Sequence, residues 1–416
     1  MGAERTTRYR EDDLMSERDK ITGGITAPAG FTAAGVACGI KPSGLDLAMI
    51  VSTPAARAAG IFTTNLAVAA PVVVTREHLR ASHGAVSSIV VNSGCANACT
   101  GDQGLAVART MATDTARAIG CSAEQVLVSS TGVIGVQLNG EKLRHGITHA
   151  VGALSREGHG AAAEAIMTTD RWAKEAAVRA TTPEGVFHVG GMAKGAGMIE
   201  PNMATMLGFL TTDADVGPDL LQRALAEAAD DTFNAITVDG ETSTNDMVLL
   251  LAGGRSGVRI DDTAYSAFVD ALHTVCRELA LAVVTGGEGA TKLVTVTVTG
   301  ARTTTEARQT ARAIANSPLV KTAVHGGDPN WGRLVAVAGR AGVAFDLTRA
   351  RVRIGEAELF SGEQVFADRE PAAAEHLKES KVVIGVDVGA GGTGTATVWT
   401  CDLSAEYVRI NADYRT

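Results

Sequence analysis

Strand-like and helix-like segments alternate along most of this chain, and this alternation constrains the fold more than any other feature of the sequence. Short apolar runs rich in β-branched residues predict strands, and longer amphipathic stretches between them predict helices. The expected strands cover residues 89–92, 126–130, 186–189, 206–211 and 247–251, and the expected helices cover residues 104–119, 218–232 and 262–284. Because the two kinds of element interleave, we expect helices packed in layers on β-sheet, in the α/β or α+β class.

The pattern changes near residue 295. Residues 293–301 alternate strictly between apolar and polar side chains, which predicts a half-buried strand. A helix is expected over residues 304–316, and residues 381–400 indicate two strands joined by a glycine-rich turn. The first residues mix both signs of charge and contain no apolar run. We therefore expect three parts: a mobile tail at 1–20, a main domain at 21–294 and a smaller α+β domain at 295–416.

Charge and cysteine usage argue against several classes of partner. The net charge is −9 and no basic stripe is present, which argues against a nucleic-acid partner. No apolar run reaches the roughly 18 residues that a membrane span requires. Six cysteines are scattered without CxxC spacing, and Cys95 and Cys99 lack the second Cys or His pair that would complete a zinc site. We expect a reduced cytoplasmic protein without a metal site.

The segment from Lys194 to Ala214 places a threonine after a small residue, between a glycine-rich turn and an apolar run. A threonine hydroxyl is a weak nucleophile unless a base lies beside it, and an N-terminal threonine carries such a base in its own α-amine. That amine exists only after the bond between Ala204 and Thr205 has been broken. The layout predicts an N-to-O acyl shift that cuts the chain at this bond, although an Ala-Thr pair alone equally fits an ordinary strand threonine.

Four other positions suit the chemistry that such a nucleophile needs. Thr131 and Gly132 follow an expected strand and offer a hydroxyl and an amide to a developing oxyanion, although Thr-Gly at a strand end is also a common turn. Lys194 suits the carboxylate of an amino-acid substrate, or it is a solvated lysine. Glu288 suits a substrate ammonium or a proton shuttle, or it is an acid that caps a helix.

Motifs in order along the whole chain resemble those of the ArgJ family, the ornithine acetyltransferases or glutamate N-acetyltransferases. They are STGVIG, AIMTTD, KGAGMIEPNMATMLGFLTTDA, FNAITVDGETSTND, GEGATK, GGDPNWGR and INADYRT. The chain departs from the family at two positions, with Cys95 in place of an asparagine and Gly286 in place of an acid. Neither departure falls on a residue to which the resemblance gives a catalytic role.

The resemblance implies a site and a reaction. It makes Thr205 the nucleophile and makes Thr131 and Gly132 the oxyanion hole, with cleavage between Ala204 and Thr205. The substrate-binding residues that it implies are Thr168 or Thr169, Lys194, Thr205, Glu288, Asn411 and Thr416. The implied reaction moves an acetyl group from N2-acetyl-L-ornithine to L-glutamate through acetyl-Thr205, as a step of arginine biosynthesis.

The resemblance further implies an αββα layered sandwich with a smaller C-terminal α+β domain, and pairing of the processed chains into an α2β2 assembly. No cofactor is implied, but some family members use acetyl-CoA as a co-substrate and form N-acetylglutamate directly. Three alternatives stay open at this point. The same nucleophile serves an aminopeptidase or amidase, a related acetyltransferase serves secondary metabolism, and a binding or scaffold protein could keep the fold without the activity.

Overall fold

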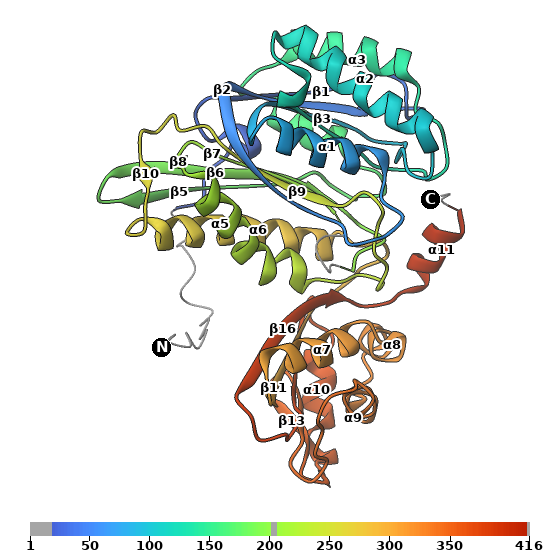
Figure 1. Ribbon diagram of the computed structural model, residues 1–416. Helices are drawn as coiled ribbons and strands as arrows, with labels where there is room; N and C mark the ends of the chain where they lie inside the picture. The colour runs from blue at the N-terminus through green and yellow to red at the C-terminus, as the bar shows by residue number, and fades with distance from the viewer. Residues whose placement is uncertain (1–18, 201–205, 414–416) are drawn as a thin grey trace.

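The computed structural model describes residues 19–200 and 206–413, and it contains two units, each built on a sheet (Figure 1). The first unit holds an eight-stranded sheet made of β1 (Phe31–Val36), β2 (Leu47–Phe62), β3 (Ala85–Asn92), β4 (Val126–Ser130), β5 (Lys174–Thr182), β6 (Gly185–Lys194), β7 (Leu207–Thr212) and β9 (Met247–Ala252). Its helices are α1 (Ala70–Ala81), α2 (Gly101–Ile119), α3 (Gly140–Ala153), α4 (His159–Ala165), α5 (Pro218–Asp230) and α6 (Tyr265–Thr285). A short ribbon of β8 (Asp215–Val216) and β10 (Arg259–Ile260) lies outside the sheet.

The eight-stranded sheet forms two layers that share its longest strand. The strand order is β4-β3-β2-β9-β7-β6-β5, with β1 also paired to β2. Residues 47–52 of β2 pair with β1, whereas residues 57–62 pair with β9. Strand β2 therefore joins a layer that contains β1, β3 and β4 to a layer that contains β5, β6, β7 and β9 (Figure 1).

Alternate residues of each layer face different hydrophobic cores, because side chains alternate across a strand. Ile50 of β2 and Leu249 of β9 lie in one core between the two layers. Met49 packs in a second core with side chains of α2 and α3, and Leu250 packs in a third core with side chains of α5 and α6. The order is therefore helix, sheet, sheet, helix, and the αββα sandwich expected from the sequence is confirmed.

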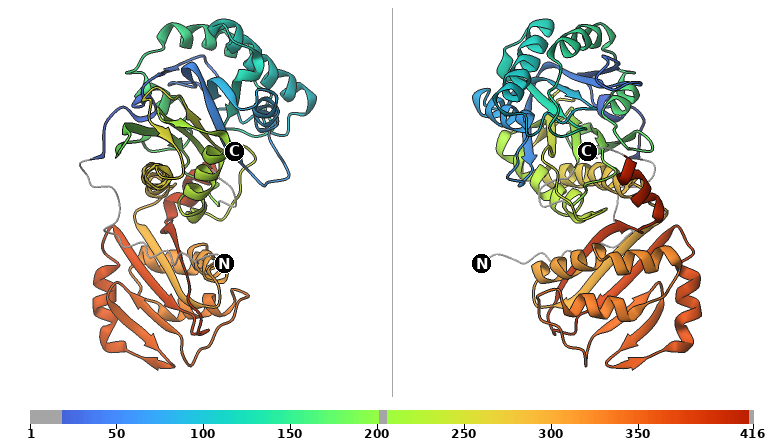
Figure 2. Two further views of the ribbon diagram at one scale, coloured as in Figure 1. Left: turned by 60° about the vertical axis from the view of Figure 1, so that its left-hand side comes forward. Right: turned by 90° about the vertical axis from the view of Figure 1, so that its right-hand side faces the viewer.

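The second unit has its own core and a six-stranded sheet with helices on one face (Figure 2). Its strands, in the spatial order β14-β13-β12-β15-β11-β16, are β14 (Gln364–Val365), β13 (Ala357–Ser361), β12 (Arg351–Ile354), β15 (Lys381–Asp387), β11 (Leu293–Ala301) and β16 (Gly394–Cys401). Its helices are α7 (Thr304–Ala315), α8 (Pro318–Gly326), α9 (Trp331–Gly339) and α10 (Glu370–His376). The start of this sheet at Leu293 supports the domain division near residue 295, which stays a prediction.

The last helix, α11 (Ala405–Asp413), returns from the second sheet to the first unit (Figure 1). It is tied there by two hydrogen bonds, from Tyr407 Oη to Asp239 Oδ2 and from Asn411 Nδ2 to Glu288 Oε2. Residues that follow the second sheet in the sequence therefore contribute to the first unit.

Most of the expected elements are present with small changes at their ends. The strand over 293–301 has the bounds of β11, and the expected helices correspond to α2, α5, α6 and α7. The two strands expected in 381–400 also exist as β15 and β16, but β11 lies between them, so they do not pair with each other. The tail expected at 1–20 falls almost wholly outside the described residues. None of the helices in the described part of the chain combines the length and apolar character of a membrane span.

Candidate functional site

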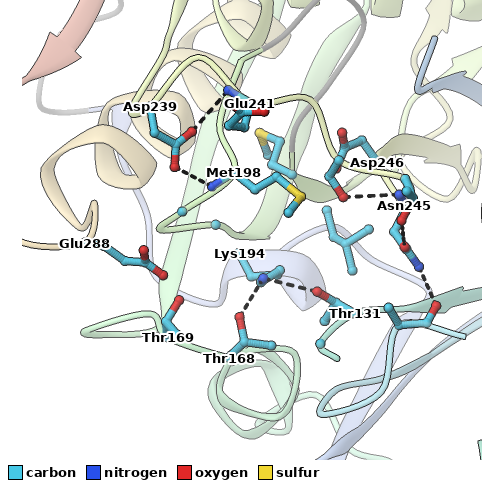
Figure 3. Close-up of a pocket in the computed structure, with 18 of the residues that line it drawn as sticks. Thr131, Thr168, Thr169, Lys194, Met198, Asp239, Glu241, Asn245, Asp246 and Glu288 are labelled. Carbon is cyan, nitrogen blue, oxygen red and sulfur yellow. Dashed lines mark hydrogen bonds between the residues drawn. The ribbon is translucent and has the colours of Figure 1, made fainter. Parts of the chain in front are cut away.

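A pocket of about 150 Å³ lies where several elements of the first unit end beside α11 (Figure 3). All the expected site residues that the structure describes line this pocket: Thr131, Gly132, Thr168, Thr169, Lys194, Glu288 and Asn411. The expected cleavage residues Ala204 and Thr205, and Thr416, lie outside the described residues. Met206 and Leu207 line the pocket, so β7 begins at the pocket directly after the expected cleavage point.

The turn after β4 presents a hydrogen-bond donor to the pocket. The Thr131 amide donates to the Asn92 carbonyl at 3.0 Å, which fixes the start of the turn. Gly132 has φ of 125°, and a Cβ there would lie 2.4 Å from the Gly94 carbonyl carbon, so only glycine fits. Within residues 19–200 and 206–413 the Gly132 amide donates no hydrogen bond. This amide is therefore free to donate to an oxygen atom of a ligand.

Lys194, the last residue of β6, places its ammonium between two threonine hydroxyls (Figure 3). Its Nζ donates to Thr168 Oγ1 at 2.8 Å and to Thr131 Oγ1 at 3.2 Å. Its side chain is only 11% exposed, so the charge is largely shielded from water. An ammonium has three donors, and one is left to bind an acceptor that enters the pocket.

A buried carboxylate, Asp170, lies behind Lys194. Asp170 Oδ1 accepts from Lys174 Nζ at 2.6 Å and from the Gly195 amide at 2.7 Å, and Oδ2 accepts from the Thr168 amide at 3.0 Å. Burial alone would raise the pKa of Asp170, but the charges of Lys194 and Lys174 outweigh burial and lower this pKa to about 2. The same carboxylate therefore holds the chain at two of the pocket-lining residues, Thr168 and Gly195.

The turn that enters the segment 201–205 is held by a second carboxylate. Asp239 Oδ2 accepts from the Met198 amide at 2.7 Å (Figure 3), and Oδ1 accepts from the Ile199 amide at 2.8 Å. Met198 has φ of 56°, a left-handed conformation that costs energy in a residue with a side chain. Burial and the Asp239 carboxylate raise the pKa of Tyr407, whose phenol donates to Asp239. The strained turn is thus held in place by hydrogen bonds.

Glu288, which follows α6, also lines the pocket. Its side chain is buried, its amide donates to the Ala196 carbonyl at 2.8 Å, and Oε2 accepts from Asn411 Nδ2 at 2.7 Å. A Cβ at Gly197 would lie 2.5 Å from Glu288 Oε2, so the carboxylate fits in this position only because residue 197 has no side chain. Glu288 therefore lies in the pocket and does not act as an exposed helix cap.

Asp246 is a pocket-lining acid that the sequence did not single out. Burial raises the pKa of Asp246 well above its usual range. Its Oδ2 has no hydrogen-bond partner in the described part of the chain. Three buried or pocket-lining acids fall inside the family motifs: Asp170 in AIMTTD, and Asp239 and Asp246 in FNAITVDGETSTND. Their place in these motifs was the only sign in the sequence that they belong to the site, because their contacts form only in the fold.

The two departures from the family pattern lie near the site. Cys95 is buried, its Sγ lies 3.3 Å from the Val136 carbonyl oxygen, and burial raises the pKa of its thiol. At Gly286 a Cβ would lie 2.9 Å from the Ala282 carbonyl oxygen and 3.1 Å from Lys174 Cε, so the glycine allows the Lys174 side chain to pack closely against it. No group of three or more His, Cys, Asp or Glu side chains within the described residues is arranged to hold a metal ion.

Fold and pocket together define an enzyme of the layered α/β sandwich type, with a free amide, a cation and carboxylates around one cavity. The sequence profile of the ArgJ family matches residues 32–416. An arginine biosynthesis bifunctional protein ArgJ of Symbiobacterium thermophilum is 50% identical over 95% of this chain and 99% of its own length. The ArgJ protein of Gloeobacter violaceus is 50% identical over 97% of this chain and 100% of its own length. The chain belongs to the ArgJ family.

Among solved structures, ornithine acetyltransferase from Mycobacterium tuberculosis, complexed with ornithine, is 44% identical in sequence. The similarity covers 44% of this chain and 96% of that chain, with a TM-score of 0.41.

Proposed function

We propose that this protein is an ornithine acetyltransferase that moves the acetyl group of N2-acetyl-L-ornithine to L-glutamate through an acetyl ester on Thr205. The observation that carries the proposal is the pocket beside the start of β7. It unites a free amide at Gly132, a cation at Lys194 and a carboxylate at Glu288. Membership of the ArgJ family supports the same reaction.

The charges around the pocket match the groups of the proposed donor substrate. The α-carboxylate of acetylornithine is assigned to Lys194, because an ammonium with a spare donor binds a carboxylate by a charged hydrogen bond. Its side-chain ammonium is assigned to Glu288, which lines the same pocket. The acetyl oxygen is assigned to the Gly132 amide and the Thr131 hydroxyl, where negative charge develops during acyl transfer.

Processing comes first in the proposed mechanism. Thr205 Oγ1 attacks the carbonyl carbon of Ala204, the peptide C–N bond breaks, and the acyl group moves from nitrogen to oxygen. The shift frees the α-amine of Thr205, and water then hydrolyses the ester, which restores the Thr205 hydroxyl and leaves a carboxylate on Ala204. The strained turn at Met198 supports this step, since it fixes the direction in which the chain enters the segment 201–205.

Acetyl transfer then follows a ping-pong route. The α-amine of Thr205 takes the hydroxyl proton while Oγ1 attacks the acetyl carbon, and the proton passes to the nitrogen of the departing ornithine. The amino group of glutamate next attacks the acetyl-Thr205 ester, which restores the hydroxyl and releases N-acetylglutamate.

The remaining expectations belong to this proposal. The two processed chains pair into an α2β2 assembly in the cytoplasm, no cofactor takes part, and acetyl-CoA is a second acetyl donor. Small molecules are the substrates, and neither nucleic acid nor a membrane is a partner. The division into domains at 21–294 and 295–416 is supported by the separate cores of the two sheets.

Denaturing mass spectrometry of fresh protein, with and without acetylornithine, tests the proposal. We expect two chains, 1–204 and 205–416, and a gain of one acetyl group on the second chain when acetylornithine is present. Adding glutamate should remove this group as N-acetylglutamate. Release of free acetate without transfer to glutamate would instead identify an amidase, and one uncut chain without acetylation would identify a binding protein.

A further inference from the structure

Two buried lysines share one carboxylate behind the pocket. Lys174 Nζ lies 2.6 Å from Asp170 Oδ1, and the side chains of both residues are fully buried. Lys194 Nζ lies 3.9 Å from Asp170 Oδ2, beyond hydrogen-bond distance. Asp170 therefore makes its short ion pair with Lys174, which does not line the pocket, and not with Lys194, which does.

The position of Lys194 depends on the pairing of Asp170 with Lys174. An unpaired buried carboxylate is costly, and it attracts the nearest available cation. In the structure Lys174 forms the ion pair with Asp170, so the Lys194 ammonium is held instead by the hydroxyls of Thr168 and Thr131. A movement of Lys194 by about 1 Å would give it a direct hydrogen bond to Asp170, at the cost of its bond to Thr131.

Lys174 is also placed to keep its charge although it is buried. Burial lowers the pKa of Lys174, and the Asp170 carboxylate opposes that effect. Lys174 Nζ also lies near Gly286, the residue that ends α6, and the carbonyl end of a helix favours a cation. Because Gly286 has no side chain, the end of the Lys174 side chain packs closely against it.

We propose that Lys174 is a positioning residue: by neutralising Asp170, it keeps the Lys194 ammonium in the pocket, where it binds the carboxylate of an amino-acid substrate. This inference rests on the proposed function, because it assumes that Lys194 contacts the substrate. It adds a role for a buried residue that contacts neither the substrate nor the reacting atoms.

Steady-state kinetics on fully processed variants test the proposal. Lys174→Met removes the short ion pair of Asp170 and leaves Lys194 as the pocket-lining cation beside it, so the KM for acetylornithine should rise about tenfold while kcat changes less than about threefold. In the double variant Asp170→Asn/Lys174→Met the charge that attracts Lys194 is gone. The KM should therefore return to within about threefold of the wild-type value.

This recovery separates positioning from a merely structural role. If Lys174 only stabilised the fold, the double variant would have a KM at least as high as that of Lys174→Met, and this result would overturn the proposal. If Lys174→Met does not yield folded protein, Lys174→Gln, which removes the charge but keeps a donor, serves the same comparison. An unchanged KM in that variant would also overturn the proposal.

Two further variants make the outcome specific. Arg308→Met removes ion pairs with Asp230 and Asp231 far from the pocket, and it should leave the KM unchanged. Lys194→Met should raise the KM directly. A normal KM in Lys194→Met would refute the proposed substrate contact itself, whereas a raised KM there with a normal KM in Lys174→Met would refute only the role of Lys174.

Discussion

The two walls of the pocket hold their charges in different ways. On the wall that precedes the proposed cleavage point, the Lys194 ammonium is held by two threonine hydroxyls, and the buried Asp170 is fully paired. The lining residues that follow it, here called the acidic wall, lie on two sides of Lys194 in Figure 3: Glu288 has one amide donor from Asn411, and Asp246 has an oxygen without a partner in the described residues. The cationic wall is organised before any ligand binds, whereas no ion pair is formed by Glu288 or Asp246 within the described residues.

This difference indicates which contacts with a ligand should matter most. A substrate carboxylate adds to a cation that is already fixed in place, so little order is lost on binding. A substrate ammonium supplies the ion-pair partner that Glu288 lacks within the described residues. A ligand with a carboxylate at one end and an ammonium at the other therefore complements both walls.

The largest expected effect tests whether the two walls belong to separate chains. Thr205→Ala removes the hydroxyl that attacks the Ala204 carbonyl, so the protein should stay one chain of 416 residues while the wild type runs as two pieces on a denaturing gel. Thr205→Ser keeps a hydroxyl and should still be cut. Cleavage of Thr205→Ala at the normal position would mean that another agent, and not Thr205, cuts the chain.

The next effect concerns the donors of the cationic wall. Loss of one oxyanion donor typically costs about 10² to 10³ in rate, so Thr131→Ala should slow both self-cleavage and acetyl transfer by this amount if one site serves both reactions. Time courses of precursor cleavage and of product formation measure the two rates. Thr113→Ala, at an exposed hydroxyl on α2, is the matched control. Slow transfer with normal cleavage would show that two separate sets of donors exist.

A smaller effect is expected on the acidic wall. Glu288→Gln keeps the shape of the side chain and loses its charge, so the KM for acetylornithine should rise about ten- to a hundredfold. A fall in kcat as well would indicate that Glu288 also shuttles a proton. Unchanged kcat and KM would show that the acidic wall is structural and that the substrate ammonium is bound elsewhere.

The smallest effect is the dependence of stability on pH, and its sign should differ between the walls. The pKa of Asp170 is lowered to about 2 in the fold, so its contribution is present at neutral pH and is lost as the pH falls from 3.8 towards 2. This loss is on the order of 2 kcal/mol. The pKa of Asp246 is raised, so its contribution is present below pH 3.8 and is lost as the pH rises.

Thermal unfolding across pH tests this contrast. Asp246→Asn should make the protein more stable at neutral pH, because an uncharged side chain then replaces a buried acid that resists ionisation. The double variant Asp170→Asn/Lys174→Met should not show the part of the fall in stability between pH 3.8 and 2 that comes from Asp170. The same pH profile in wild type and both variants would contradict the assignment of charges to the two walls.

Elements with a regular local pattern of side chains were predicted correctly from the sequence. Elements whose pattern depends on neighbouring strands in the sheet were not. Strand β11 alternates strictly, and its predicted and observed bounds agree. Strand β2 was not predicted, because its two halves lie in different layers and Pro54 interrupts the strand pattern. The insertion of β11 between β15 and β16 depends on contacts between residues about 90 to 110 positions apart in the chain, which no local rule encodes.

The candidate site was predicted unevenly for a similar reason. The resemblance selected the pocket-lining residues Thr131, Lys194, Glu288 and Asn411, although the last two are 123 residues apart. It did not select Lys174, because lysines are rarely buried and nothing in the sequence marks this one as an exception. The buried network could be recognised only from the distances in the fold.

The strand order of the first sheet has a consequence for the cut molecule. Strands β7 and β9, from the proposed second chain, lie between β2 and β6, from the first, and each boundary is a ladder of six residue pairs. Cleavage therefore nicks a continuous sheet, and the two pieces cannot separate without exposing the edges of its central strands. The precursor folds as one molecule, whereas denatured mature protein must find its partner piece in a bimolecular, concentration-dependent step. If the proposed cleavage occurs, refolding of the mature protein should therefore become slower as the solution is diluted.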